Sequence, residues 1–189
     1  MAADRDQVIA PAYTFPATAS PFAFDGIAVI FADADAYGNV TAAAIADRMA
    51  PNVRAVIVTH MWGSPCAMDE IAAYCRARGL LLLEDCSHAH FASWHGARVG
   101  TLADMAVFST NQKAVTTGEG GILVTRHDRL RELALLYGHY NKRGAVPSST
   151  ASPGAWPGTR SSARSPSLRR TGSTGCTWSA CGSARATPP

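Results

Sequence analysis

Short apolar runs recur through the first 140 residues of the chain, and most are separated by segments with helix signals. The runs are rich in Val, Ile, Leu and Ala, and they lie at residues 8–10, 27–31, 55–58, 80–83, 105–108 and 122–124. Strands with continuously apolar sequences are typical of a largely parallel sheet whose two faces are both covered by helices. The sequence therefore predicts an α/β fold.

Three segments between or after these runs carry helix signals. Thr41 is a residue type that caps helices, and it precedes a helix expected to reach Met49. Residues 68–75 place apolar side chains at i, i+3, i+4 and i+7, and Gly79 follows where a helix-ending glycine belongs. A third helix is expected over residues 127–136.

Polar residues that directly follow the apolar runs are the first functional candidates. In parallel sheets, ligands bind beyond the carboxyl ends of the strands. We therefore expect Asp33, His60, Asp85 and Ser109 on one functional rim. Taken alone, an aspartate such as Asp85 could equally cap a helix or bond to a loop.

A lysine and a glycine-rich segment follow the run at residues 105–108. Lys113 lies in the expected loop, and Thr-Thr-Gly-Glu-Gly-Gly at residues 116–121 leads into the next run. A lone lysine in a loop is usually solvated, and glycines there permit tight turns. Neither feature alone assigns a reaction.

The order of several sequence blocks is more specific. The blocks are VIAPAYTFPATA, AVIVTHMWGSPCAMDEI, EDCSHAH, GARVGTLADMAVFSTNQK and TTGEGGILVT. Together they resemble the DegT/DnrJ/EryC1/StrS family of sugar aminotransferases, which depend on pyridoxal 5'-phosphate (PLP), over about residues 7–140. The resemblance implies the large domain of a fold-type-I PLP-transferase, a mostly parallel sheet with helices on both faces, here incomplete.

The resemblance also implies roles for five residues. Lys113 matches the lysine that binds PLP as a Schiff base and shuttles the substrate proton. Asp85 matches the partner of the pyridine nitrogen. His88 falls where the family usually has a glutamine near the cofactor's 3-oxygen, Ser109 matches a phosphate ligand, and Phe15 matches an aromatic residue stacked on the ring.

Three of these roles have alternatives. His88 departs from the family glutamine and could be a packed histidine of the rim. Phe15 could be an ordinary core phenylalanine. Ser109 lies four positions before Lys113, where the family has five, so either the loop is one residue shorter or Thr110 shares the phosphate role.

The activity implied is transfer of an amino group from an amino acid donor, glutamate or glutamine, to a keto-sugar or keto-cyclitol. It would serve amino-sugar, antibiotic or surface polysaccharide biosynthesis, and the full-length family is expected to form homodimers. Lys113 argues against the branch of relatives that carry histidine there and act as dehydratases. The alternative is a catalytically inactive fragment, either a pseudogene product or a non-enzymatic interaction protein.

The chain divides by composition into two parts. Residues 1–144 are expected to form a partial PLP-binding domain; they hold 12 Lys and Arg against 14 acidic residues, a charge of −2. Residues 145–189 hold five Arg and no acidic residue, are rich in Ser, Gly and Pro, and are expected to be disordered. We hypothesise a frameshift in a G+C-rich gene as their origin. The resemblance also implies that N-terminal and dimer-forming segments of the family are missing here, so we expect weak or no activity for this chain.

Other classes of function have little support in the sequence. No run of about 20 apolar residues predicts a membrane span, and no signal peptide is evident, so the expected compartment is the cytoplasm. The basic residues after 144 lack the pattern of a nucleic-acid site. His60, His90 and His95 show no metal spacing and are expected to be structural, and the five cysteines are expected to be reduced thiols.

Overall fold

A computed structural model describes residues 6–138 and Ser179–Ala180 of the 189-residue chain. Over these residues the main sheet has seven strands in the order β2-β1-β3-β4-β7-β8-β9. Neighbouring strands from β2 to β7 are parallel, whereas β8 and β9 join antiparallel. The strands are β1 Gln7–Pro11, β2 Ala28–Ala32, β3 Val53–Thr59, β4 Leu81–Asp85, β7 Met105–Ser109, β8 Gly121–Thr125 and β9 Ser179–Ala180.

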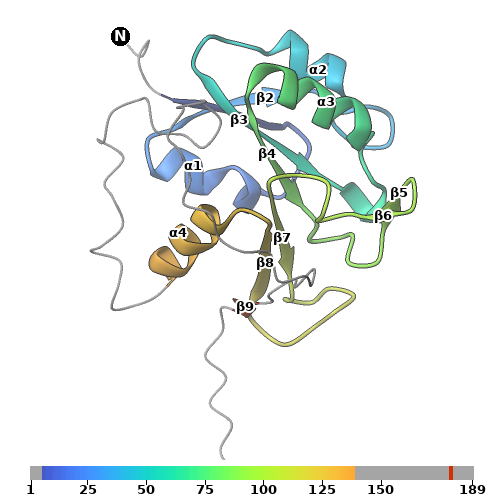
Figure 1. Cartoon of the computed structure of the whole chain (residues 1–189). Coiled ribbons are helices and arrows are strands. Elements are labelled where there is room, and N and C mark those ends of the chain that lie inside the picture. Colours follow the sequence, from blue (N-terminus) through green and yellow to red (C-terminus); the bar gives the residue numbers. More distant parts are fainter. Residues whose placement is uncertain (1–5, 139–178, 181–189) are drawn as a thin grey trace, which may run out of the picture.

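Helices cover both faces of this sheet. Figure 1 shows α2 and α3 on one side of the strands and α1 and α4 on the other. The helices are α1 Ser20–Phe24, α2 Ala42–Asp47, α3 Met68–Arg78 and α4 Asp128–Gly138. Two short 3-10 turns, η1 Pro16–Thr18 and η2 Met61–Gly63, and a small hairpin of β5 Ser93–Trp94 and β6 Ala97–Arg98 complete the described elements.

The six predicted strands and three predicted helices are confirmed, with small shifts at their ends. The Thr41 hydroxyl accepts the Ala44 N–H at 3.1 Å, and Gly79 ends α3 with a φ of 65°. The antiparallel direction of β8 was not predicted, because a continuously apolar strand looks the same in either direction. Helix α1 was missed as well, since its five residues have no capping side chain.

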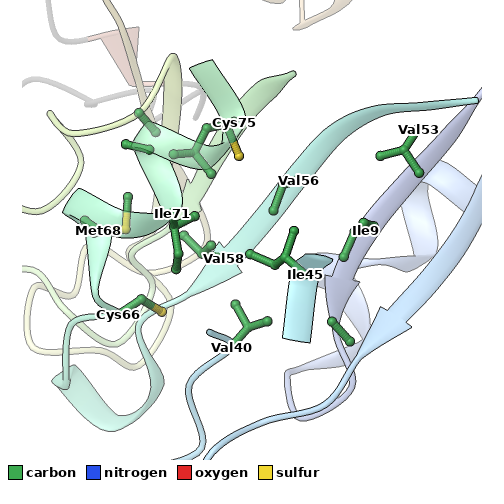
Figure 2. Close-up of a cluster of buried hydrophobic side chains, with 14 residues drawn as sticks. Ile9, Val40, Ile45, Val53, Val56, Val58, Cys66, Met68, Ile71 and Cys75 are labelled. Carbon is green, nitrogen blue, oxygen red and sulfur yellow. The ribbon is translucent and has the colours of Figure 1, made fainter. Parts of the chain in front are cut away.

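The larger core cluster lies between the sheet and helices α2 and α3, as Figure 2 shows. Ile45, Met68 and Ile71 extend from these helices toward Val56 and Val58 of β3. A second cluster covers the opposite face, where alternate strand residues pack against Ala19 and Phe22; these strand residues are Val8, Ala10, Ala55 and Ile57. Because successive side chains of a strand point to opposite faces, both faces of β1 and β3 are buried.

The expected tail at residues 145–189 lies outside the described residues except for β9. There, Ser179 and Ala180 pair with Leu123 and Ile122 of β8. The expected domain boundary at residue 144 also lies outside them. Among the described helices, none combines the length and apolar character needed to cross a membrane.

Candidate active site

The carboxyl end of β4 places Asp85 between the ends of β3 and β7. The residue is 8% exposed. Its Oδ1 accepts the Ser87 N–H at 3.0 Å, and its Oδ2 accepts the Thr18 hydroxyl at 2.7 Å. A carboxylate offers about four lone pairs, so Asp85 keeps the capacity to accept a further donor.

Three threonine hydroxyls form a directed chain that ends at Asp85. Each hydroxyl has one hydrogen to donate, and Thr18 donates its hydrogen to the carboxylate. The Thr14–Thr18 contact of 2.9 Å is therefore donated by Thr14, and the Thr14–Thr59 contact of 2.9 Å by Thr59. The chain thus runs from Thr59 on β3, through the segment after β1, to Asp85.

Lys113 reaches the same end of the sheet from the loop between β7 and β8. Its Nζ lies 3.2 Å from Nε2 of His88, which belongs to the turn after β4. A protonated lysine only donates, so in that state Nε2 is the acceptor and the ring hydrogen lies on Nδ1. Gln112, just before Lys113, has a φ of 49°, a sparsely populated conformation that recurs at functional sites.

Ser109 and Thr110, at the start of this loop, differ in burial and in hydrogen bonding. Thr110 is buried; its N–H bonds to the Gly120 carbonyl at 3.0 Å, and its hydroxyl accepts that of Thr117 at 3.0 Å. Ser109 is half-buried, and its Oγ accepts the Asn111 N–H at 3.3 Å. Thr110 therefore closes the loop internally, and Ser109 is the hydroxyl nearer to solvent.

Phe15 follows β1 at the same edge and is 70% exposed, so it is not a core phenylalanine. Its neighbours Thr14 and Thr18 belong to the hydroxyl chain that ends at Asp85. The structure thus brings His88 and Lys113 into contact, in the turn that follows Asp85, and it places Phe15 and Ser109 at the same edge of the sheet.

His60 corrects one sequence expectation. Its side chain is fully buried instead of lying on an accessible rim. The Cys66 N–H donates to Nδ1 at 3.1 Å, so Nε2 carries the ring hydrogen and donates to Oε2 of Glu84 at 3.0 Å. Both nitrogens are used within the protein, which agrees with the expected structural role.

Glu84 connects His60 to the loop before β7. Besides His60, its carboxylate accepts three backbone N–H groups at 2.8–3.0 Å, from Gly100, Leu102 and Ala103. Since buried carboxylates are stable only with such partners, Glu84 anchors this loop to β4.

Three potential metal ligands meet in this buried region. Ligand atoms of His60, Glu84 and Cys86 lie within 4.8 Å of one another. The nitrogen and oxygen atoms already have donors or acceptors in the protein. Burial, followed by the charges of Glu84 and Asp85, raises the pKa of the Cys86 thiol, which opposes the thiolate that a metal requires. We interpret the group as structural.

Two residues that the sequence did not single out contact the site. Thr18 bonds Asp85, and the Trp62 ring stacks on His88 with centroids 5.4 Å apart and an interplanar angle of 18°. Both lie inside the blocks that carry the family resemblance, YTFPATA and HMWG. A hydroxyl three positions after Phe15, and an aromatic residue two positions after a strand-end histidine, were the available signals.

Comparison with known proteins places this chain in a family. The model of the DegT/DnrJ/EryC1/StrS aminotransferase family matches residues 1–149. Protein MosB of Rhizobium meliloti is 40% identical over 129 residues, which are 67% of this chain and 25% of that protein. A putative L-glutamine:3-amino-2,3-dideoxy-scyllo-inosose aminotransferase of Micromonospora echinospora is 33% identical over 142 residues, 74% of this chain and 34% of that protein.

A solved structure agrees with these sequence matches. The crystal structure of DesI in the presence of its TDP-sugar product superposes with a TM-score of 0.69 at 34% identity, covering 78% of this chain and 39% of that one. The fold is that of the fold-type-I aminotransferases, and this chain spans only part of the full-length fold. Fold and sequence agree that the chain belongs to the DegT/DnrJ/EryC1/StrS aminotransferase family.

Proposed function

We propose that the chain carries the cofactor site of a PLP-dependent aminotransferase. The observation that carries the proposal is the contact of Lys113 with His88, in the turn that begins at Asp85. An amine and a carboxylate at the carboxyl edge of one parallel sheet are the two groups that PLP chemistry needs from a protein. Family membership supports the same assignment.

The residues present fit the cofactor. Asp85 has spare acceptor capacity for a protonated ring nitrogen, and Lys113 has a primary amine at the same edge. Ser109 offers a half-buried hydroxyl for the phosphate, and Phe15 offers an exposed aromatic face for the ring. His88 would face the 3-oxygen of the ring in place of the family glutamine.

PLP, when bound, supplies an electron sink for the carbon that gains or loses the amino group. In this chain Lys113 would hold the cofactor covalently and carry the proton at Nζ. Asp85 would keep a proton on the ring nitrogen through a charge-assisted hydrogen bond, and the threonine chain would hold Asp85 in place.

The proposed reaction moves an amino group from an amino acid donor, glutamate or glutamine, to a keto-sugar or keto-cyclitol. The names of the relatives support this substrate class, since one is an inosose aminotransferase and another was solved with a TDP-sugar product. The biosynthesis of amino sugars, antibiotics or surface polysaccharides is the proposed setting. A homodimer is the proposed assembly.

The test uses the fact that the sequence has two lysines, Lys113 and Lys142. We expect added PLP to produce a visible absorbance band that is lost in Lys113→Ala and kept in the control Lys142→Ala. Absence of the band from the native chain would reject cofactor binding and favour the inactive-fragment alternative. A band lost only in Lys142→Ala would contradict the assignment of Lys113.

A further inference from the structure

The His88 ring has one hydrogen-bond contact among the described residues, with the proposed cofactor lysine. Its Nε2 lies 3.2 Å from Nζ of Lys113. Nδ1 is buried and has no hydrogen-bond partner among the described residues. One hydrogen bond at one atom does not fix the plane of an imidazole ring, so packing contacts have to set this plane.

The Trp62 ring makes one such contact. The two rings are nearly parallel, at 18°, with centroids 5.4 Å apart, which is the range of favourable stacking. Trp62 is 71% exposed, so it is not held there by burial in the core. Its side chain covers one face of His88 while most of its surface remains open to solvent.

The backbone places Trp62 there at some cost. Its φ of 54° and ψ of 20° are left-handed, which is unfavourable for a bulky residue. The flanking residues brace this turn: the Met61 N–H donates to Oδ1 of Asn39 at 3.1 Å, and the Ser64 N–H donates to the Met61 carbonyl at 2.8 Å. Strain that the surroundings enforce is concentrated at functional positions.

The turn also packs directly on the backbone of His88. A Cβ built on Gly63 would lie 3.2 Å from the His88 carbonyl oxygen, and Gly63 has a φ of +86°. Trp62 therefore presents its ring from a turn that is fixed against the same residue on which it stacks.

We propose that Trp62 is a positioning residue. Its ring holds the His88 ring in the orientation in which Nε2 contacts Nζ of Lys113. The inference rests on the proposed function only in that it treats Lys113 as the cofactor lysine. In this proposal Trp62 acts on the lysine through His88.

The stack can be tested by NMR of the histidine rings in the chain without PLP. We expect Trp62→Ala to move the His88 ring resonance downfield, because the shielding of the indole is lost, and Trp62→Phe to retain much of the shielding. The matched control is Trp94→Ala, since Trp94 contacts His95 with centroids 4.6 Å apart and should move that resonance instead. A His88 resonance unmoved by Trp62→Ala would overturn the proposal.

The effect on the lysine can be tested by competitive acylation of the chain, again without PLP. Peptide mapping gives the ratio of labelling at Lys113 to that at Lys142. We expect Trp62→Ala to raise this ratio roughly two- to tenfold, which is the range that the loss of a stacked aromatic pair accounts for. In Trp62→Phe the ratio should return most of the way to its native value.

A double-mutant cycle separates positioning from a general structural role. In a His88→Ala background, Trp62→Ala should change the labelling ratio no further, because its route to Lys113 is gone. An unchanged ratio in Trp62→Ala, or a further rise in the double variant, would overturn the proposal. Neither measurement contains PLP, so a chain that binds no PLP would reject the proposed function without deciding this inference.

Discussion

At the scale of single residues, two neighbouring carboxylates at the end of β4 have different hydrogen-bond partners. Glu84 is 1% exposed and bonds His60 and the loop before β7, whereas Asp85 bonds Thr18 and Ser87. Side chains that follow each other along a strand point to opposite faces, so the pleat of β4 separates a structural acid from a candidate functional one.

Glu84→Gln should destabilise the protein. The amide would place an NH₂ group against donors that now point at a carboxylate, leaving buried polar groups unpaired. We expect a loss of roughly 2–4 kcal/mol in the free energy of unfolding, measured by urea denaturation. The control is Glu70→Gln on the exposed surface of α3, and equal midpoints for the two variants would contradict this account.

Thr18→Val should disturb Asp85 without changing the volume of the site. The isosteric side chain removes the hydrogen donated to Oδ2 at 2.7 Å and should lower the free energy of unfolding by about 1–3 kcal/mol. Thr18→Ser keeps the hydroxyl and should recover much of this loss. Thr59→Val lies at the far end of the chain of hydroxyls and should cost less. A Thr18→Ser variant as unstable as Thr18→Val would show that the methyl group, and not the hydrogen bond, matters.

At the scale of elements, the loop from Gly100 to β7 determines where β7 begins. Glu84 bonds its backbone, and Gly100 has a φ of +87° with the Phe108 ring beside it. A Cβ on Gly100 would lie 2.5 Å from that ring. Because β7 leads directly to Ser109 and Lys113, the position of the candidate site depends on this close approach.

Gly100→Ala and Gly79→Ala form a matched pair that measures the approach. Both glycines have positive φ, but a Cβ on Gly79 would meet nothing within 4 Å. We expect Gly79→Ala to cost about 1 kcal/mol through backbone conformation alone. Gly100→Ala should cost clearly more in urea denaturation, since Phe108 would have to move. Equal losses would mean that the packing of Phe108 contributes nothing.

The strands and longer helices could be predicted from the sequence, because apolar runs and the cap at Thr41 are local signals. The direction of β8 and the existence of α1 could not, since strand direction and short helices depend on tertiary contacts. Among the site residues, Lys113 and Asp85 came from the order of sequence blocks. The contacts of Trp62 and Thr18 depend on side-chain directions that no local pattern carries.

At the scale of the whole molecule, buried thiols predict how stability depends on pH. Burial, assisted by the charge of Asp35, raises the pKa of Cys66 from its ordinary value of 9.0 to about 12, and burial with Asp104 does the same for Cys75. The folded state therefore holds protons that the unfolded state loses above pH 9. The stabilising contribution is complete below pH 9 and is lost as pH rises toward 12.

Urea denaturation between pH 8 and pH 11 checks this dependence. The free energy of unfolding should fall as pH rises, and Cys66→Ala combined with Cys75→Ala should reduce the slope, although the variant is less stable at pH 8. The same slope in both proteins would assign the pH dependence to other groups.

The proposed function depends above all on Lys113 being the lysine that binds PLP. Reduction of the PLP-treated chain with borohydride, followed by peptide mapping, tests this assignment, since the two lysines fall in different peptides. We expect a pyridoxyl group on Lys113 in the native chain, and we expect this selective labelling to disappear when the chain is unfolded before PLP is added. Labelling of Lys142 alone, or no selective labelling of Lys113 in the folded chain, would rule out Lys113 as the cofactor lysine.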